Sequence, residues 1–235
     1  TTEIYTLSLH DALPIYAPKM ISYGLNWLEE EYISGTPLNR IKSVYHKQII
    51  INALITAHND SLLVPSKNLL PATVYLNKKH IDLTSKLFDG RLVLKPEVKQ
   101  NIINTFMRLV HHVSIEIVPV GWTHGDFHQG NILVDNNNIF KVIDWEASER
   151  RFWLYDFFVL LSEIRSHGDI EIAFNTFRLH EKLLPEYESF IDDFDILILI
   201  EELYFSVNED CSPNYFVSGE KTLRLCNQIN NYLQA

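Results

Sequence analysis

The sequence predicts an α+β chain in which short strands come first, a β-hairpin stands in the middle and helices fill the remainder. Apolar, strand-like segments near the start, residues 17–23 and 26–33, are separated by a turn. A second pair, residues 132–134 and 139–143, flanks a polar turn and is typical of a β-hairpin. After Arg151 the apolar residues recur at helical spacing. Strands followed by helices indicate the α+β class.

The expected helices share apolar residues that recur every three or four positions. Pro37 suits the first turn of the first helix, because its missing N–H has no intrahelical partner there. Residues 115–122 are expected to form a strand that leads into the loop at residues 124–131, and residues 59–68 a polar linker. The expected helices span residues 37–57, 74–88, 96–113, 153–166, 169–183, 187–207 and 218–233.

The composition and net charge of the chain argue against some classes of binding partner and environment. The chain has 235 residues, enough for one large domain or two small ones, and a hydrophobic content of 46% that can fill a core. A net charge of -10 argues against nucleic acid as a partner, since that interaction needs a basic face. The most apolar run, residues 196–200, is too short to cross a membrane. Cys211 and Cys226 make no disulfide framework, which favours a cytoplasmic setting.

The strongest chemical pattern lies between the expected strand and the hairpin. His124, Asp126 and Asn131 have the spacing H-x-D-x-x-x-x-N, and Asp144 follows at the end of the hairpin. In phosphoryl transfer the protein aligns the nucleophile, binds the metal ion and neutralises the charge on the transferring group. It contributes little covalent chemistry. A tight loop can present Asp126 to a hydroxyl group. The hairpin can bring Asp144 beside Asn131, so that both side-chain oxygens can meet Mg²⁺.

The residues at these motif positions resemble those of the aminoglycoside phosphotransferase and choline kinase family. His-Gly-Asp at residues 124–126, Ile-Asp-Trp-Glu at 143–146 and Tyr155-Asp156 are each similar to family motifs. The resemblance covers about residues 16–165. It implies a protein-kinase-like fold, here mostly the helical C-terminal lobe with its catalytic-loop hairpin. It also implies ATP or GTP as phosphoryl donor, Mg²⁺ as metal and a hydroxyl of a small molecule as acceptor.

The resemblance assigns roles residue by residue. Asp126 would be the catalytic base or the carboxylate that orients the hydroxyl, and Asn131 and Asp144 would be Mg²⁺ ligands. His124 and Asp156 would support the loop.

The segment from Trp27 to Leu38 is similar to the family's hinge, which implies that the backbone C=O of Glu31 and the N–H of Ile33 face the adenine ring. The Gly-rich loop, the phosphate-binding lysine and its glutamate partner, which the family carries ahead of the hinge, have no counterpart here. We therefore expect the small β lobe to be largely missing.

Residues 1–15, TTEIYTLSLHDALPI, lack the pattern of a signal peptide. They match the translation of a common sequencing-library adapter, so we expect an artefact with the upstream part of the protein lost. The expected domains are an adapter-derived segment over residues 1–15, a remnant of the small lobe and hinge over 16–35, and a helical catalytic lobe over 36–235. On this expectation the parent protein is an active kinase-type phosphotransferase, whereas the chain as written is inactive.

Two other functions stay open. The first is a non-catalytic fragment or pseudokinase, against which the intact Asp126, Asn131 and Asp144 argue. The second is a metal-dependent hydrolase, because His124, Asp126 and His128 alternate and could bind Zn²⁺ or Mn²⁺. In that case Asn131 and Asp144 would have no role.

An acidic group in the C-terminal part of the chain has two interpretations. Glu201, Glu202, Glu209 and Asp210 could form a solvated helix face, which is the preferred interpretation. They could instead form an acidic lip for a cationic acceptor such as an aminoglycoside or an amino alcohol. The sequence leaves the acceptor, the choice of ATP or GTP and the oligomeric state open.

Overall fold

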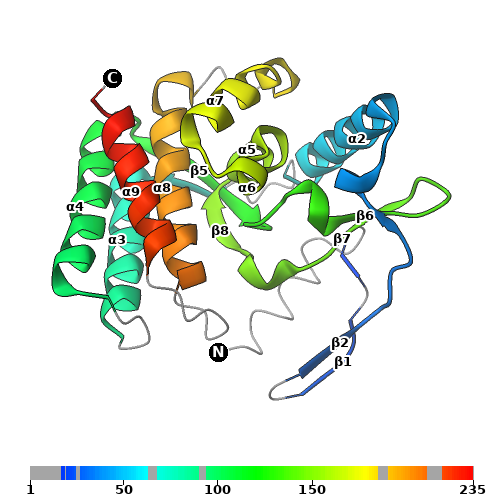
Figure 1. The fold of residues 1–235 in the computed structure, drawn as a ribbon, viewed down its shortest axis with the longest axis horizontal. Helices are drawn as coiled ribbons and strands as arrows, with labels where there is room; N and C mark the ends of the chain where they lie inside the picture. The colour runs from blue at the N-terminus through cyan, green and yellow to red at the C-terminus, as the bar shows by residue number, and fades with distance from the viewer. Residues whose placement is uncertain are drawn as a thin grey trace. The chain divides into compact units, whose positions relative to one another are not determined.

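The structure is a computed structural model, and its chain divides into two compact units. Unit 1 comprises Thr1–Lys67 and Gly121–Glu163, and unit 2 comprises Asn68–Val120 and Ile164–Ala235. The interpretation of residues 1–15 as an adapter lies outside the described residues. The structure describes residues 17–18, 20–24, 27–62, 68–89, 94–184, 190–210 and 219–234 (Figure 1).

Unit 1 begins with an antiparallel strand pair. β1 (Met20–Gly24) pairs with β2 (Trp27–Glu30), with Tyr23 opposite Leu28 and a register shift between Met20 and Ser22. The two strands expected at this end of the chain are therefore present. Beyond them, residues 31–35 have no regular secondary structure.

The expected β-hairpin is present and belongs to a small sheet of order β3-β6-β7. β6 (Ile132–Val134) and β7 (Phe140–Val142) are antiparallel, and β3 (Thr36–Pro37) adds to the other edge of β6. Asp135 Oδ1 closes the turn by accepting the backbone N–H groups of Asn137 and Ile139, both at 2.8 Å. Such local side-chain acceptors are the reason why Asp and Asn favour turns.

The prediction of one helix over residues 37–57 is wrong at both ends. A 3₁₀ turn, η1 (Leu38–Arg40), ends at the extended Ile41, and α2 (Val44–Leu62) starts later and runs into the expected linker. Ser43 Oγ accepts the backbone N–H of His46 at 3.2 Å, which is the usual side-chain cap of a helix N-terminus. The serine, and not Pro37, therefore sets the start of the helix.

The single helix expected over residues 153–166 is interrupted. α5 (Tyr155–Ser162) ends at Glu163, whose φ of 54° lies in the left-handed region, and α6 (Ile164–His167) follows. Every side chain of α5 is buried, so this segment shows no polar face. Before it, β8 (Glu149–Phe152) is a strand that the sequence did not predict, with β5 as its neighbour in the sheet.

Unit 2 is built from helices that pack around α8 (Figure 1). α8 (Ile191–Asp210) contacts α3 (Ala72–Phe88), α4 (Pro96–His112) and α9 (Glu220–Tyr232). α8 is apolar around most of its circumference, which is typical of a helix enclosed by others. The helices expected in these four regions are confirmed.

The rest of unit 2 departs from the expectation in small ways. α7 (Ile170–Arg178) contacts α9 and ends earlier than expected, before the 3₁₀ turn η4 (Glu181–Leu183). Asn68, expected to end a linker, instead begins β4 (Asn68–Pro71), which pairs antiparallel with β5 (Ile117–Thr123). No helix of the described part of the chain is long and apolar enough to cross a membrane.

The interpretation of the acidic group as a solvated face is wrong for the residues that α8 buries. Glu201 is fully buried and Glu202 and Asp210 nearly so. Glu201 Oε2 lies 2.7 Å from Lys79 Nζ. Both carboxylate oxygens of Glu202 lie 2.9 Å from Arg165 Nη1. These pairs neutralise the two glutamates inside unit 2, as burial of charge requires.

Candidate active site

The loop that follows β5 in unit 1 is held by a buried carboxylate from α5. Asp156 Oδ2 accepts the backbone N–H of His124 at 2.7 Å, and its Oδ1 accepts that of Gly125 at 2.9 Å. Asp156 is buried and stands in the first turn of α5, where the helix dipole favours negative charge. The backbone that leads into Asp126 is thus fixed by charge-assisted hydrogen bonds from outside the loop.

His124 joins the loop to the hairpin. Its Nε2 lies 2.8 Å from the backbone oxygen of Ile143, and its Nδ1 accepts the backbone N–H of Asp126 at 3.3 Å. The ring is buried and packs on the indole of Trp145, with centroids 4.6 Å apart. Burial lowers the pKa of His124, because desolvation opposes the imidazolium form. His124 is therefore a neutral, structural imidazole with both nitrogens engaged.

Asp126 and Asn131 lie together at the two ends of the loop. Asn131 Nδ2 donates to the backbone oxygen of Asp126 at 3.1 Å and lies 3.4 Å from its Oδ2. Asn131 is buried, whereas 23% of the Asp126 side chain is exposed. Because the amide nitrogen faces Asp126, the amide oxygen of Asn131 is turned away and accepts no hydrogen bond from the described residues.

The hairpin places the backbone just before Asp144 beside Asn131. The backbone N–H of Ile143 donates to the backbone oxygen of Asn131 at 2.9 Å, so the two segments are in register. Asp144 is exposed and has φ 65° and ψ 59°, a left-handed conformation that costs about 1–3 kcal/mol for a residue other than glycine. It precedes η3 (Trp145–Ala147), but its carboxylate does not cap that turn. The carboxylate is therefore available for another partner.

The donor set fits Mg²⁺. The amide oxygen of Asn131 and the carboxylate of Asp144 are hard oxygen ligands, and Mg²⁺ is usually held by one or two such groups together with phosphates and water. Over the described residues, no three His, Cys, Asp or Glu side chains gather into a metal cluster. The alternating His124, Asp126 and His128 therefore do not form the hydrolase site that the sequence left open, since both nitrogens of His124 are already bonded.

Some neighbours of the loop were not predicted as residues of the kinase-type site, although His128 was considered as a ligand of the alternative hydrolase site. His128 Nδ1 accepts the backbone N–H of Gly130 at 2.9 Å, and its Nε2 lies 3.5 Å from Asp126 Oδ2. Gln129 accepts from Lys47 Nζ at 3.2 Å and donates to Glu163 at 3.0 Å, which links α2, the loop and the end of α5. His128 stands two residues from Asp126, and that proximity was the signal available in the sequence.

The predicted hinge residues lie elsewhere in unit 1. Glu31 and Ile33 belong to the irregular segment between β2 and β3, and Glu31 is exposed. Their backbone groups have no described contact with the catalytic loop, so the adenine-binding role stays a prediction.

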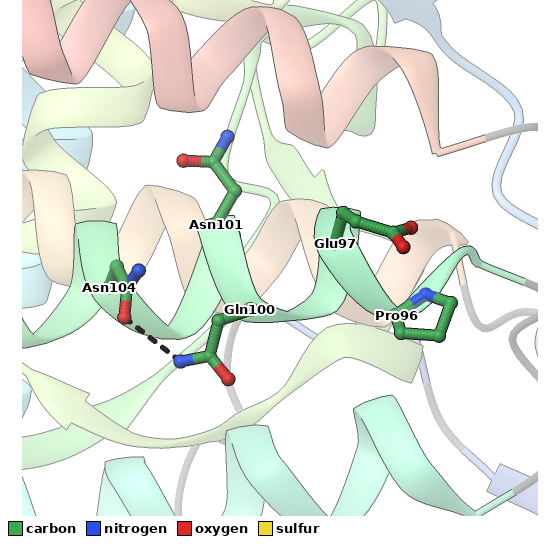
Figure 2. A pocket seen from close by; sticks show the side chains of 5 residues that line it. All are labelled: Pro96, Glu97, Gln100, Asn101 and Asn104. Atoms are coloured by element: carbon green, nitrogen blue, oxygen red, sulfur yellow. Dashed lines mark hydrogen bonds between the residues drawn. The ribbon is translucent and has the colours of Figure 1, made fainter.

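A hollow on the surface of unit 2 is unrelated to the predicted site. Figure 2 shows that its lining comes from one helix, α4, and that Gln100 Nε2 donates to Asn104 Oδ1 at 2.9 Å. A single exposed helix face offers no convergent catalytic groups, so the loop and hairpin of unit 1 define the candidate active site. The lining residues are Pro96, Glu97, Gln100, Asn101 and Asn104.

Comparisons with known proteins show what the chain is similar to. The model of a family described as "Phosphotransferase enzyme family" matches residues 81–190, which include the whole loop and hairpin. The fold is similar to that of an ADP-bound aminoglycoside phosphotransferase APH(2'')-Ib, with 15% identity, a TM-score of 0.57, and coverage of 97% of this chain and 79% of that one. No curated sequence gives a significant match.

Two kinases of small alcohols share the fold. Choline kinase LicA from Streptococcus pneumoniae is 14% identical with a TM-score of 0.58, and the match covers 98% of this chain and 80% of that one. Ethanolamine kinase from Plasmodium vivax is 17% identical with a TM-score of 0.54, over 96% of this chain and 70% of that one.

The family match over residues 81–190 and the shared fold make the chain similar to kinase-type phosphotransferases. The resemblance to the aminoglycoside phosphotransferase and choline kinase family is confirmed as a resemblance, and the protein-kinase-like α+β fold is confirmed as well.

Proposed function

We propose that the protein transfers the γ-phosphoryl group of ATP, or of GTP, to a hydroxyl group of a small molecule. The observation that carries the proposal is the contact of Asp126 with Asn131 in a loop that Asp156 clamps and to which the hairpin bonds through Ile143. Similar folds solved with ADP or with AMP-PNP support a nucleoside triphosphate as donor.

In this proposal Asp126 orients the acceptor hydroxyl and receives its proton. The hydroxyl oxygen forms a bond to the γ-phosphorus while the bond from that phosphorus to the bridging oxygen of the nucleotide breaks, and the diphosphate leaves. The partly exposed Asp126 carboxylate can reach a bound acceptor, because the rest of the loop stays anchored by His124 and Asp156. Alignment of this kind supplies most of the rate enhancement in phosphoryl transfer.

Asn131 and Asp144 are the residues that would hold Mg²⁺. When bound, the metal neutralises negative charge on the transferring phosphates. The exposed Asp144 carboxylate and the amide oxygen of Asn131, which accepts no hydrogen bond from the described residues, support this assignment. Backbone groups of Glu31 and Ile33 would receive the adenine ring, on the strength of the hinge-like sequence around them.

The acceptor class includes cationic hydroxyl compounds such as aminoglycosides and amino alcohols, because a net charge of -10 attracts cations. Glu201 and Glu202 are not part of the proposed attraction, since Lys79 and Arg165 already neutralise them. We place the reaction in the cytoplasm, where the two cysteines, one of them the buried Cys226, stay reduced.

To test the proposed phosphoryl transfer, the protein is expressed as its source locus encodes it. Release of the nucleoside diphosphate is measured with Mg²⁺-ATP or Mg²⁺-GTP and a panel of sugars, aminoglycosides, amino alcohols and homoserine. The matched control is Asp126→Asn, which keeps the shape of the side chain and removes its charge. We expect acceptor-dependent turnover that the control lacks. Nucleotide binding without turnover on any acceptor would instead identify a pseudokinase.

A further inference from the structure

Arg151 is a buried arginine that contacts residues on both sides of the candidate active site. Arg151, in β8, has 1% of its surface exposed and is among the largest fully buried side chains, whereas its neighbour Arg150 is exposed. Removing a guanidinium group from water is unfavourable unless charges and hydrogen bonds compensate it. The partners that compensate it at Arg151 therefore show what this side chain holds together.

Those partners come from both halves of the site. Arg151 Nη1 donates to the backbone oxygen of Ala147 at 2.8 Å and to Thr123 Oγ1 at 3.2 Å. Glu149 supplies the countercharge, with Oε1 3.2 Å from Arg151 Nε. Thr123 directly precedes the catalytic loop, and Ala147 ends the turn that starts after Asp144. One nitrogen atom thus bridges the segment before Asp126 and the segment after Asp144.

Gly125 makes room for this bridge. Its φ is +84°, and a Cβ atom built on it would lie 2.3 Å from Arg151 Nη1 and 2.5 Å from the backbone oxygen of Ala147. The loop backbone therefore lies directly against the hydrogen bond between Arg151 and Ala147. Any shift of the guanidinium would be transmitted to Gly125, and so to Asp126.

We infer that Arg151 is a positioning residue that sets the separation of Asp126 from Asp144, an inference that rests on the proposed function of these two residues. The guanidinium suits the task because its nitrogens donate in several fixed directions. A lysine at this position would keep the charge, but it has one nitrogen on a flexible stem. Arg151 also lies 5.7 Å from the ring centre of Tyr155, the residue that precedes the loop-bracing Asp156.

The test compares Arg151→Met and Arg151→Lys with Arg150→Met, the matched control on the exposed neighbour, in the protein as its source locus encodes it. Amide hydrogen exchange is followed over residues 123–126 and 145–148, with α9 as an internal reference. Calorimetry measures the affinity for Mg²⁺-ADP, and steady-state kinetics gives kcat and the acceptor KM.

For Arg151→Met we expect faster exchange in both site segments with α9 unchanged, and weaker Mg²⁺-ADP binding. We expect kcat to fall by about 10- to 100-fold with little change in the acceptor KM, the scale for misplaced catalytic groups. Arg151→Lys should give a smaller change in the same direction, and Arg150→Met none. If Arg151→Met fails to fold, the same exchange, calorimetry and kinetic measurements on Arg151→Lys test the inference.

Equal acceleration of exchange in α9, with kcat falling only with the folded fraction, would overturn the inference and leave Arg151 a general stabiliser. Wild-type exchange and kcat in both Arg151 variants would overturn it as well. Local acceleration at both site segments in a protein that transfers phosphate to no acceptor supports the positional link and refutes the proposed function, so the two failures are distinguishable.

Discussion

His124 Nε2 and the backbone oxygen of Ile143 lie 2.8 Å apart, so one imidazole joins the catalytic loop to the hairpin. The bond is made by the neutral ring, whose pKa burial has lowered. In the unfolded chain the same histidine has its ordinary pKa near 6.5 and takes up a proton more readily. Stability from this group is therefore fully present above about pH 6.5 and is lost as the pH falls toward the lowered pKa.

We predict that the free energy of unfolding falls between pH 7 and pH 5 by up to about 1.4 kcal/mol per pH unit from His124 alone. Urea denaturation at several pH values measures it, with His124→Gln as the reference that lacks a titrating ring. The difference in stability between the two proteins should shrink as the pH falls. A constant difference over this range would mean that His124 is not the titrating group.

Removal of the Asp126 carboxylate should strongly lower turnover without unfolding the protein. Asp126→Ala is expected to lower kcat by roughly two or more orders of magnitude, the usual scale for losing general-base and orienting help. Asp144→Ala should in addition weaken nucleotide binding that depends on Mg²⁺. Kinetics and Mg²⁺-ADP calorimetry on both variants check this. Near-normal turnover of Asp126→Ala would remove it from the proposed role.

Comparing Gly125 with Gly168 separates two reasons why alanine would destabilise the protein at a glycine, namely the left-handed backbone and steric overlap of the new methyl group. Both have positive φ, +84° and +62°, but a Cβ atom at Gly168 would meet nothing within 4 Å. Gly168→Ala should therefore lose only about 1–2 kcal/mol for the left-handed backbone. Gly125→Ala should lose more, because its methyl group would overlap Arg151 and Ala147. Thermal and urea unfolding measure both variants, and equal losses would contradict the steric part of the explanation.

The buried pair of Lys79 and Glu201 should stabilise unit 2 only as a pair. Lys79→Met leaves the fully buried Glu201 carboxylate without its cation and is expected to destabilise the protein by about 3–5 kcal/mol. Lys79→Met combined with Glu201→Gln should recover part of that loss. Urea denaturation of the single and double variants forms the test. A mild single variant would show that the Tyr75 hydroxyl, which also contacts Glu201, is partner enough.

Local signals in the sequence predicted much of this structure. The spacing of His124, Asp126 and Asn131 located the loop, and the apolar periodicity of α4, α8 and α9 located these helices. The start of α2 was misplaced because Pro37 was preferred to the capping Ser43 as the start signal. The break at Glu163 carries no glycine or proline, so nothing in the local sequence marks its left-handed backbone.

What could not be predicted depends on residues far apart in the chain. Glu201 was interpreted as a surface residue because its partner Lys79 lies 122 positions away. Arg151 was not predicted as a site residue, because its hydrogen bonds to Thr123 and Ala147 form only in the folded chain. The spacing of residues along the chain therefore predicts the candidate catalytic side chains. The residues that position those side chains are recognised only from the folded structure.

The supports of the catalytic loop are separate from its reactive carboxylate. Asp156 and His124 fix the backbone, while the Asp126 side chain approaches Asn131 Nδ2 at 3.4 Å and His128 Nε2 at 3.5 Å. One codon change at position 126 could therefore silence the chemistry while leaving the shape of the molecule untouched. If the protein acts as proposed, a single substitution at Asp126 would give a protein that binds nucleotide without consuming it, and selection for folding would not oppose that change.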